Sequence, residues 1–159
     1  MSETGSGERE GHRFFAGAIF NEVWELLEKP DRAKHDDEAM VHAAHASCYH
    51  WLHAGTGLHH QRGEWMIARV YSVLGIAEAA LRHANRCLEL TREHAGLMED
   101  FDPAFAYECV ARANAVAGQR DEALRYLRLA EQAGERISNE EDRQLFVSEL
   151  NGGDWHGIR

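Results

Sequence analysis

Apolar residues recur at steps of three and four along most of the chain, which is the period of an amphipathic helix. The first such stretch covers residues 13–29, and Pro30 ends it. A second helix spans residues 36–54, with Asp36 and Asp37 at its start and Gly55 after its end. The same pattern predicts helices over about residues 58–74, 77–94, 103–118, 120–137 and 141–150. No strand pattern occurs, so we predict an all-α fold, an antiparallel array of about seven helices.

Local signals support several of these boundaries. Thr56 is a suitable cap for the helix over residues 58–74. Asp102 and Pro103 together mark the start of the fifth helix, since proline is favoured in the first turn. Residues 138–141, with the sequence Ser-Asn-Glu-Glu, match a capping box that opens the seventh. We expect one helical domain over residues 12–150, a flexible tail over residues 1–11 and a frayed C-terminal tail over residues 151–159.

The composition suits one compact domain, because 159 residues with 44% hydrophobic content can bury a continuous core. A net charge of −10 argues against binding to nucleic acid or to anionic membranes, both of which require clustered Lys and Arg. No apolar run reaches the length of a membrane span, and no signal-peptide pattern is seen, so we expect a cytoplasmic protein. Cys48, Cys87 and Cys109 are expected to be reduced thiols.

Two successive helix pairs carry small and aromatic residues at characteristic spacings. The second pair has Tyr107, Val110, Ala111, Asn114, Gly118, Ala123, Leu127 and Ala130. The first pair has Ile67, Ala68, Tyr71, Gly75, Ala80 and Cys87. This pattern, over residues 64–137, resembles the tetratricopeptide repeat, although the two turn glycines lie farther apart than its period of about 34 residues. The resemblance implies right-handed stacking of helix hairpins.

Three stretches, EVWELLEKPDR, AAHASCYHW and RGEWMIARVYSVLG, are also similar to a family of small bacterial proteins with no assigned activity. The tetratricopeptide resemblance implies a concave surface lined by the first helix of each pair. In this sequence that surface would draw on Glu64, Arg69, Tyr71, Tyr107, Glu108 and Arg112. The leading interpretation is therefore a protein-interaction or scaffold module that binds a protein or peptide. Because the last helix resembles a polar cap, the first or second helix is the expected face for a homodimer.

Histidine is concentrated in one part of the chain, with seven of 11 histidines between His35 and His60. Glu38, His42 and His45 follow one another at i, i+4 and i+7 on the helix over residues 36–54. Two imidazoles and a carboxylate suit a divalent first-row transition metal, with Cys48 or a residue of the next helix as a further ligand. The alternative interpretation is hence a metal-binding protein. The competing interpretation, which the absence of the HExxH and paired Glu-x-x-His motifs favours, is that these histidines are hydrogen-bonded between helices or solvated and bind no metal.

Acid–base chemistry is another alternative, in a pocket between the second, third and fifth helices. The candidate groups there are His50, His60, Glu64, Tyr71, Tyr107 and Glu108, whose pKa values burial could tune. Clustered histidines would also allow a pH sensor. Trp24, Trp51 and Trp65 are expected to anchor the core rather than to form a ligand cage. Whether the protein is an enzyme is left open by the sequence.

Overall fold

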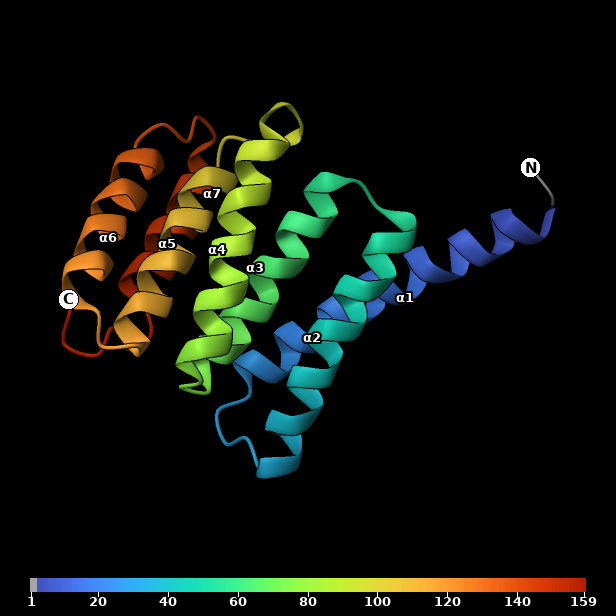
Figure 1. Ribbon diagram of the computed structural model, residues 1–159, viewed down its shortest axis with the longest axis horizontal. Coiled ribbons are helices and arrows are strands. Elements are labelled where there is room, and N and C mark those ends of the chain that lie inside the picture. The colour runs from blue at the N-terminus through green and yellow to red at the C-terminus, as the bar shows by residue number, and fades with distance from the viewer. Residues whose placement is uncertain (1–2) are drawn as a thin grey trace.

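The computed structural model describes residues 3–159, with side chains from Gly5 onward (Figure 1). These residues form seven α-helices, one short 3-10 helix and no strand, which confirms the all-α helical array. The elements are α1 (Glu3–Glu28), α2 (Lys34–Ala54), α3 (Gly57–Val73), α4 (Ala77–Glu93), η1 (Ala95–Leu97), α5 (Asp102–Val116), α6 (Arg120–Gly134) and α7 (Glu140–Asn151). Within residues 3–159, none of the helices combines the length and the hydropathy needed to cross a bilayer.

Consecutive helices pair as hairpins, α1 with α2, α3 with α4, and α5 with α6. The hairpins lie side by side, since α2 packs on α3 and α4 packs on α5, and α7 contacts α5 and α6 (Figure 1). Two core clusters run through this array, one centred on α1 to α5 and one joining α5, α6, α7 and the C-terminal segment. The hairpin arrangement therefore extends N-terminal to residue 64, where the sequence shows no repeat unit.

The second and third hairpins turn in the same way. Gly75 and Gly118 follow α3 and α5 with φ of 73° and 72°, a left-handed conformation that glycine adopts without steric cost. In each turn the residue after the glycine donates its N–H to a carbonyl five residues earlier, Ile76 to Tyr71 at 2.9 Å and Gln119 to Asn114 at 2.9 Å. The small residues Ala68, Ala80, Ala111 and Ala123 are fully buried in the cores beside these turns.

The N-terminal prediction is wrong for residues 3–11, which are helical, while residues 1 and 2 lie outside the described part of the chain. This part of α1 projects away from the other helices (Figure 1). Around Gly7 and Gly11 a side chain would meet no neighbouring atom within 4 Å. The segment lacks the apolar residues by which a helix is recognised, and its glycines Gly5, Gly7 and Gly11 disfavour a helix, although it contains no proline.

The C-terminal prediction is also wrong, because residues 151–159 fold back onto the second core. Trp155 is 5% exposed, and its Nε1 donates to the carbonyl of Leu150 at 2.9 Å. The guanidinium carbon of Arg112 lies 4.2 Å from the centre of the Trp155 indole. Trp155 and the partly buried Ile158 are the apolar anchors of this segment, too few to produce a periodic pattern.

The cap of α7 lies one residue later than predicted. Asn139, not Ser138, accepts the N–H of Asp142 at 3.0 Å. Ser138 instead donates from its backbone N and from Oγ to Asp100, at 2.8 and 2.7 Å. These bonds tie the loop before α7 to the loop before α5.

Candidate functional site

A groove opens between α1, α3, α5 and α7, with a volume of about 370 Å³. It lies on the side of the array formed by the first helix of each hairpin. Most of its lining is apolar, and six side chains supply it: Phe20, Trp24, Trp65, Phe101, Phe105 and Leu145. Such a cavity, concave and chiefly aromatic, is the usual setting of a ligand or peptide site.

The aromatic rings of the groove come from three helices and contact one another. The ring of Trp65 lies 5.7 Å from that of Trp24 and 5.9 Å from that of Phe105, the latter nearly edge-on at 85°. Phe20 precedes Trp24 by four residues and Phe101 precedes Phe105 by four, so each pair lies on one face of its helix. Trp24 and Trp65 thus serve both the core and the groove, whereas the sequence predicted core anchors only.

Two buried polar atoms belong to residues of the groove wall and have no hydrogen-bond partner within the described residues. They are Nε1 of Trp65 and Oε1 of Gln61, whose Nε2 donates to Thr91 Oγ1 at 3.0 Å. Buried polar atoms nearly always have a partner in folded proteins. Nε1 of Trp65 and Oε1 of Gln61 are thus unsatisfied in one wall of the groove, and both atoms are shielded from solvent.

The rim of the groove carries charge. Arg62 and Asp102 form a two-pronged ion pair, with both N–O distances 3.0 Å, and Glu149 pairs with Arg69 at 3.1 Å. Glu28 is exposed at the same rim. Asp102 and Glu149 are thus each neutralised by an arginine, and the exposed Glu28 carboxylate supplies the remaining negative charge of the groove.

The six residues predicted as a binding surface do not form one. Glu108 and Arg112 are buried and hydrogen-bonded to each other, and Arg69 lies 3.6 Å from the Glu108 carboxylate. Arg112 also donates to the backbone carbonyls of Glu149 and Gly152, at 2.6 and 2.8 Å. These three charges connect α3 and α5 to α7 and the C-terminal segment instead of facing a partner.

The other three predicted residues point elsewhere. Tyr107 is half-buried and stacks on Tyr126 of α6, with ring centres 6.4 Å apart. Glu64 and Tyr71 belong to a polar cluster between α2, α3 and α4. The sequence placed them on the correct helices but not on the correct face, because the rotation of each helix within its hairpin is fixed only by packing.

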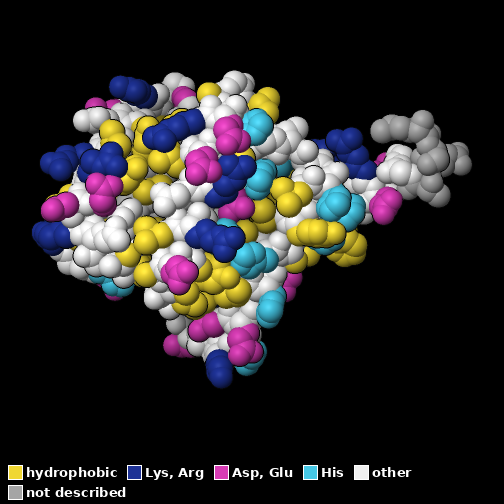
Figure 2. All heavy atoms as spheres, viewed as in Figure 1, with side chains coloured by type: hydrophobic (Ala, Val, Ile, Leu, Met, Phe, Trp, Pro, Cys, Tyr) yellow, Lys and Arg dark blue, Asp and Glu magenta, His cyan; other side chains and the backbone are white. Residues whose placement is uncertain are grey.

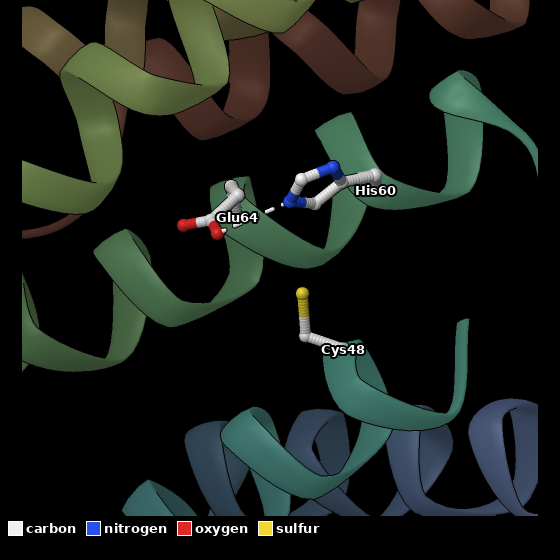
Figure 3. A group of neighbouring side chains, drawn as sticks. All are labelled: Cys48, His60 and Glu64. Atoms are coloured by element: carbon white, nitrogen blue, oxygen red, sulfur yellow. Dashed lines mark ion pairs between the residues drawn. The ribbon is translucent and has the colours of Figure 1, made fainter. Parts of the chain in front are cut away.

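The polar cluster brings Cys48 of α2 close to His60 and Glu64 of α3 (Figure 3). Their ligand atoms all lie within 4.8 Å of one another, and Nε2 of His60 is 3.4 Å from Oε1 of Glu64. The thiol can approach because Gly63 has no side chain, since a Cβ there would lie 2.7 Å from Cys48 Sγ. In the part of the chain that the structure describes, this is the group of three whose geometry could hold a metal ion.

A second layer of polar groups surrounds this trio. Nδ1 of His83 lies 2.5 Å from the other carboxylate oxygen of Glu64, and the His83 ring stacks on Tyr71 with centres 5.8 Å apart. The hydroxyl of Tyr71 lies 2.8 Å from Nε2 of His45. Histidines of α2, α3 and α4 are thereby connected to one carboxylate.

The protonation states in this cluster follow from burial and from these neighbours. Burial raises the pKa of Glu64, but the hydrogen bond and the charge of His83, with those of His60, outweigh it and hold this pKa below its usual value. Burial, with a contribution from Glu64, raises the pKa of the Cys48 thiol to about 12. A thiol with this pKa is not an activated nucleophile.

The predicted metal ligands are not brought together by the structure. Glu38 and His42 are exposed on α2, and His45 is engaged with Tyr71. Instead, the structure joins Cys48, which the sequence suggested as an additional ligand, to His60 and Glu64 of the next helix. Only the i, i+4 spacing of His60 and Glu64 was visible beforehand, because the approach of the thiol depends on how α2 packs on α3.

The predicted acid–base pocket is divided in the same way. His60, Glu64 and Tyr71 share the polar cluster, while His50 lies 2.8 Å from His12 of α1 and Glu108 is bound by Arg112.

No protein-family model, curated protein or solved structure matches the chain.

Proposed function

We propose that this protein is a tetratricopeptide-like interaction module that holds a segment of a partner protein in the groove between α1, α3, α5 and α7. The observation that carries this proposal is the aromatic lining of the groove, supplied by the first helices of successive hairpins. Helical repeat proteins use that side of the array for partner binding. The repeated glycine turns after α3 and α5 support the same assignment.

The size and chemistry of the groove define the part of the partner that enters it. A volume of about 370 Å³ is near the lower end of the range for ligand sites, so it suits one or two bulky apolar side chains. The segment is thus expected to insert an aromatic or large aliphatic anchor between the rings of the groove.

The charge of the module selects the neighbours of that anchor. The chain carries a net charge of −10, and the exposed carboxylate of Glu28 lies at the rim of the groove. Complementary charge speeds association and favours the correct partner. We therefore propose an amphipathic segment with Lys or Arg beside the apolar anchor.

The three buried free thiols suit a reducing compartment, and we propose that the module acts in the cytoplasm.

Selection from a displayed random peptide library tests this proposal, followed by anisotropy measurements with the enriched peptides. Leu145 is 56% exposed on α7 and lines the groove, so Leu145→Lys adds a positive charge there without removing a core residue. Val147, 46% exposed on the same helix, does not line this groove, and Val147→Lys is the matched control.

We expect enriched peptides to combine a bulky apolar residue with basic neighbours. Leu145→Lys should lower the affinity for these peptides by about tenfold or more, and Val147→Lys should lower it by less than about twofold. Absence of enrichment, or equal weakening by both variants, would contradict the proposal. Stabilisation by small aromatic compounds without any peptide binding would assign the groove to a different occupant and also contradict it.

A second copy of the chain is a candidate partner for a different surface. Phe14, Phe15, Tyr49 and Leu52 are more than half exposed along the outer edge of α1 and α2. Figure 2 shows hydrophobic and histidine side chains together where the projecting part of α1 leaves the body. The opposite end of the array is covered by α7 and Trp155. A patch of this kind at one end favours a twofold dimer through α1 and α2.

Sedimentation equilibrium distinguishes this arrangement from a monomer. We expect a dimer for the full chain, a monomer for Phe14→Glu, and a dimer for Leu97→Glu, which changes an exposed leucine of η1 far along the chain from the patch. A monomeric wild-type protein, or a Phe14→Glu protein that stays dimeric, would overturn it.

A further inference from the structure

We propose that Cys48, His60 and Glu64 bind a divalent transition-metal ion, and that zinc suits this ligand set best. The site lies between α2 and α3 and shares no residue with the groove lining, so this proposal can be tested independently of the proposed function. It also differs from the set that spacing along α2 suggested, because two of its three ligands come from α3.

The three ligand atoms are close to the arrangement that zinc requires. In a tetrahedral zinc site, bonds of about 2.0–2.3 Å place neighbouring ligand atoms about 3.5 Å apart. The His60–Glu64 distance is already 3.4 Å, and no pair in the trio exceeds 4.8 Å. Small rotations about side-chain bonds therefore bring Sγ, Nε2 and the carboxylate oxygen to one ion, with both helices in place.

The charges of the trio balance those of a divalent cation. A thiolate and a carboxylate supply two negative charges, and a neutral imidazole supplies none. Binding would release the Cys48 thiol proton to solvent, as is general for cysteine ligands.

The surroundings of Glu64 resemble the support that metal-binding carboxylates have in known sites. One oxygen faces His60, while His83 holds the other at 2.5 Å and is itself stacked on Tyr71. Such outer partners fix the orientation of a ligand before the ion arrives. Among the side chains of the trio, Cys48 is buried, Glu64 is 12% exposed and His60 is 25% exposed. The ion would enter beside His60, where water can complete its coordination.

Titration with cobalt(II) tests this site directly, because zinc has a filled d shell and gives no absorption signal. We expect one equivalent of cobalt(II) to produce a near-ultraviolet thiolate-to-metal band in protein first treated with chelator, and added zinc to remove it. Cys48→Ser should abolish the thiolate band. His60→Asn should retain the fold, judged by circular dichroism, and weaken cobalt(II) binding by about tenfold or more.

The matched controls are His42→Ala and Glu38→Gln, which change exposed residues of the same histidine-rich helix. Both should bind cobalt(II) as the wild type does. Absence of a thiolate band in the wild-type protein, or its persistence in Cys48→Ser, would overturn the proposal. Loss of binding in His42→Ala would do the same by assigning the ion to other ligands.

Discussion

Gly63 lies so close to Cys48 that a Cβ atom on the glycine would be 2.7 Å from the sulfur. The contact joins α3 to α2 across the interface between the first and second hairpins. It explains why a residue without a side chain occurs in the middle of α3, where glycine is otherwise unfavourable. It also determines how far the thiol extends toward His60 and Glu64.

Gly63→Ala is expected to destabilise the protein by about 1–3 kcal/mol, because the added methyl group must push α2 and α3 apart. Gly17→Ala is the matched control, since a Cβ on that glycine of α1 would meet nothing within 4 Å. That control should gain about 0.5–1 kcal/mol from helix propensity alone. Urea denaturation measures both, and equal effects in the two variants would show that the helices do not approach as described.

Trp155→Ala should lower the free energy of unfolding by about 3–5 kcal/mol, as expected when a buried aromatic residue is truncated. Trp155→Phe keeps an apolar ring but loses the hydrogen bond from Nε1 to Leu150, and should cost about 1 kcal/mol more than the ring volume alone explains. Chemical denaturation followed by far-ultraviolet circular dichroism gives these values. If Trp155→Ala left the free energy of unfolding unchanged, residues 151–159 would again be interpreted as a frayed tail.

The buried pair of Glu108 and Arg112 predicts strong coupling between two substitutions. Arg112→Met removes the cation that is hydrogen-bonded to a carboxylate with 1% exposure, leaves only the more distant Arg69 beside it, and should cost about 3–5 kcal/mol. Adding Glu108→Met removes this poorly compensated buried charge, so the double variant should lose less than the sum of the single losses. A double-mutant cycle measures this coupling, and simple additivity would contradict the buried ion pair.

Asp100 predicts a component of acid destabilisation. Hydrogen bonds from the backbone and hydroxyl of Ser138 hold the pKa of Asp100 below its ordinary value. A lowered pKa in the folded state adds stability that is present above the ordinary pKa and is lost as pH falls through the folded-state value. Between about pH 5 and pH 3, wild-type protein should thus lose more stability than Asp100→Asn. Thermal unfolding at a series of pH values measures this difference, and melting temperatures of the wild type and Asp100→Asn that fall in parallel with pH would exclude this contribution of Asp100.

Much of the fold could be predicted from the sequence because its helices are amphipathic and are separated by strong end signals. Pro30, Gly75 and Gly118 each act locally, through backbone conformation, so their effect does not depend on distant packing. The two ends of the chain were wrongly predicted for opposite reasons. The start of α1 is helical without an apolar stripe, and the C-terminal segment is anchored by a single buried residue, Trp155.

The candidate sites were harder to predict, since they depend on contacts between helices. A period of 3.6 residues shows which residues share a face, but not which neighbouring helix that face meets. Arg69, Glu108 and Arg112 were therefore placed on a surface, although α7 and the C-terminal segment cover them. The aromatic pairs at i, i+4 in α1 and α5 were a signal for the groove, and they look the same in sequence as core residues.

The most direct test of the proposed function is the response of the indole N–H resonances to a selected peptide in an NMR titration. The chain has four tryptophans, of which Trp24 and Trp65 line the groove. Trp51 stacks on His59 and Trp155 packs under Arg112, both outside it. We predict that the indole N–H resonances of Trp24 and Trp65 shift, because their rings line the groove, while those of Trp51 and Trp155 stay unchanged. Shifts confined to Trp51 or Trp155 would contradict binding in the groove.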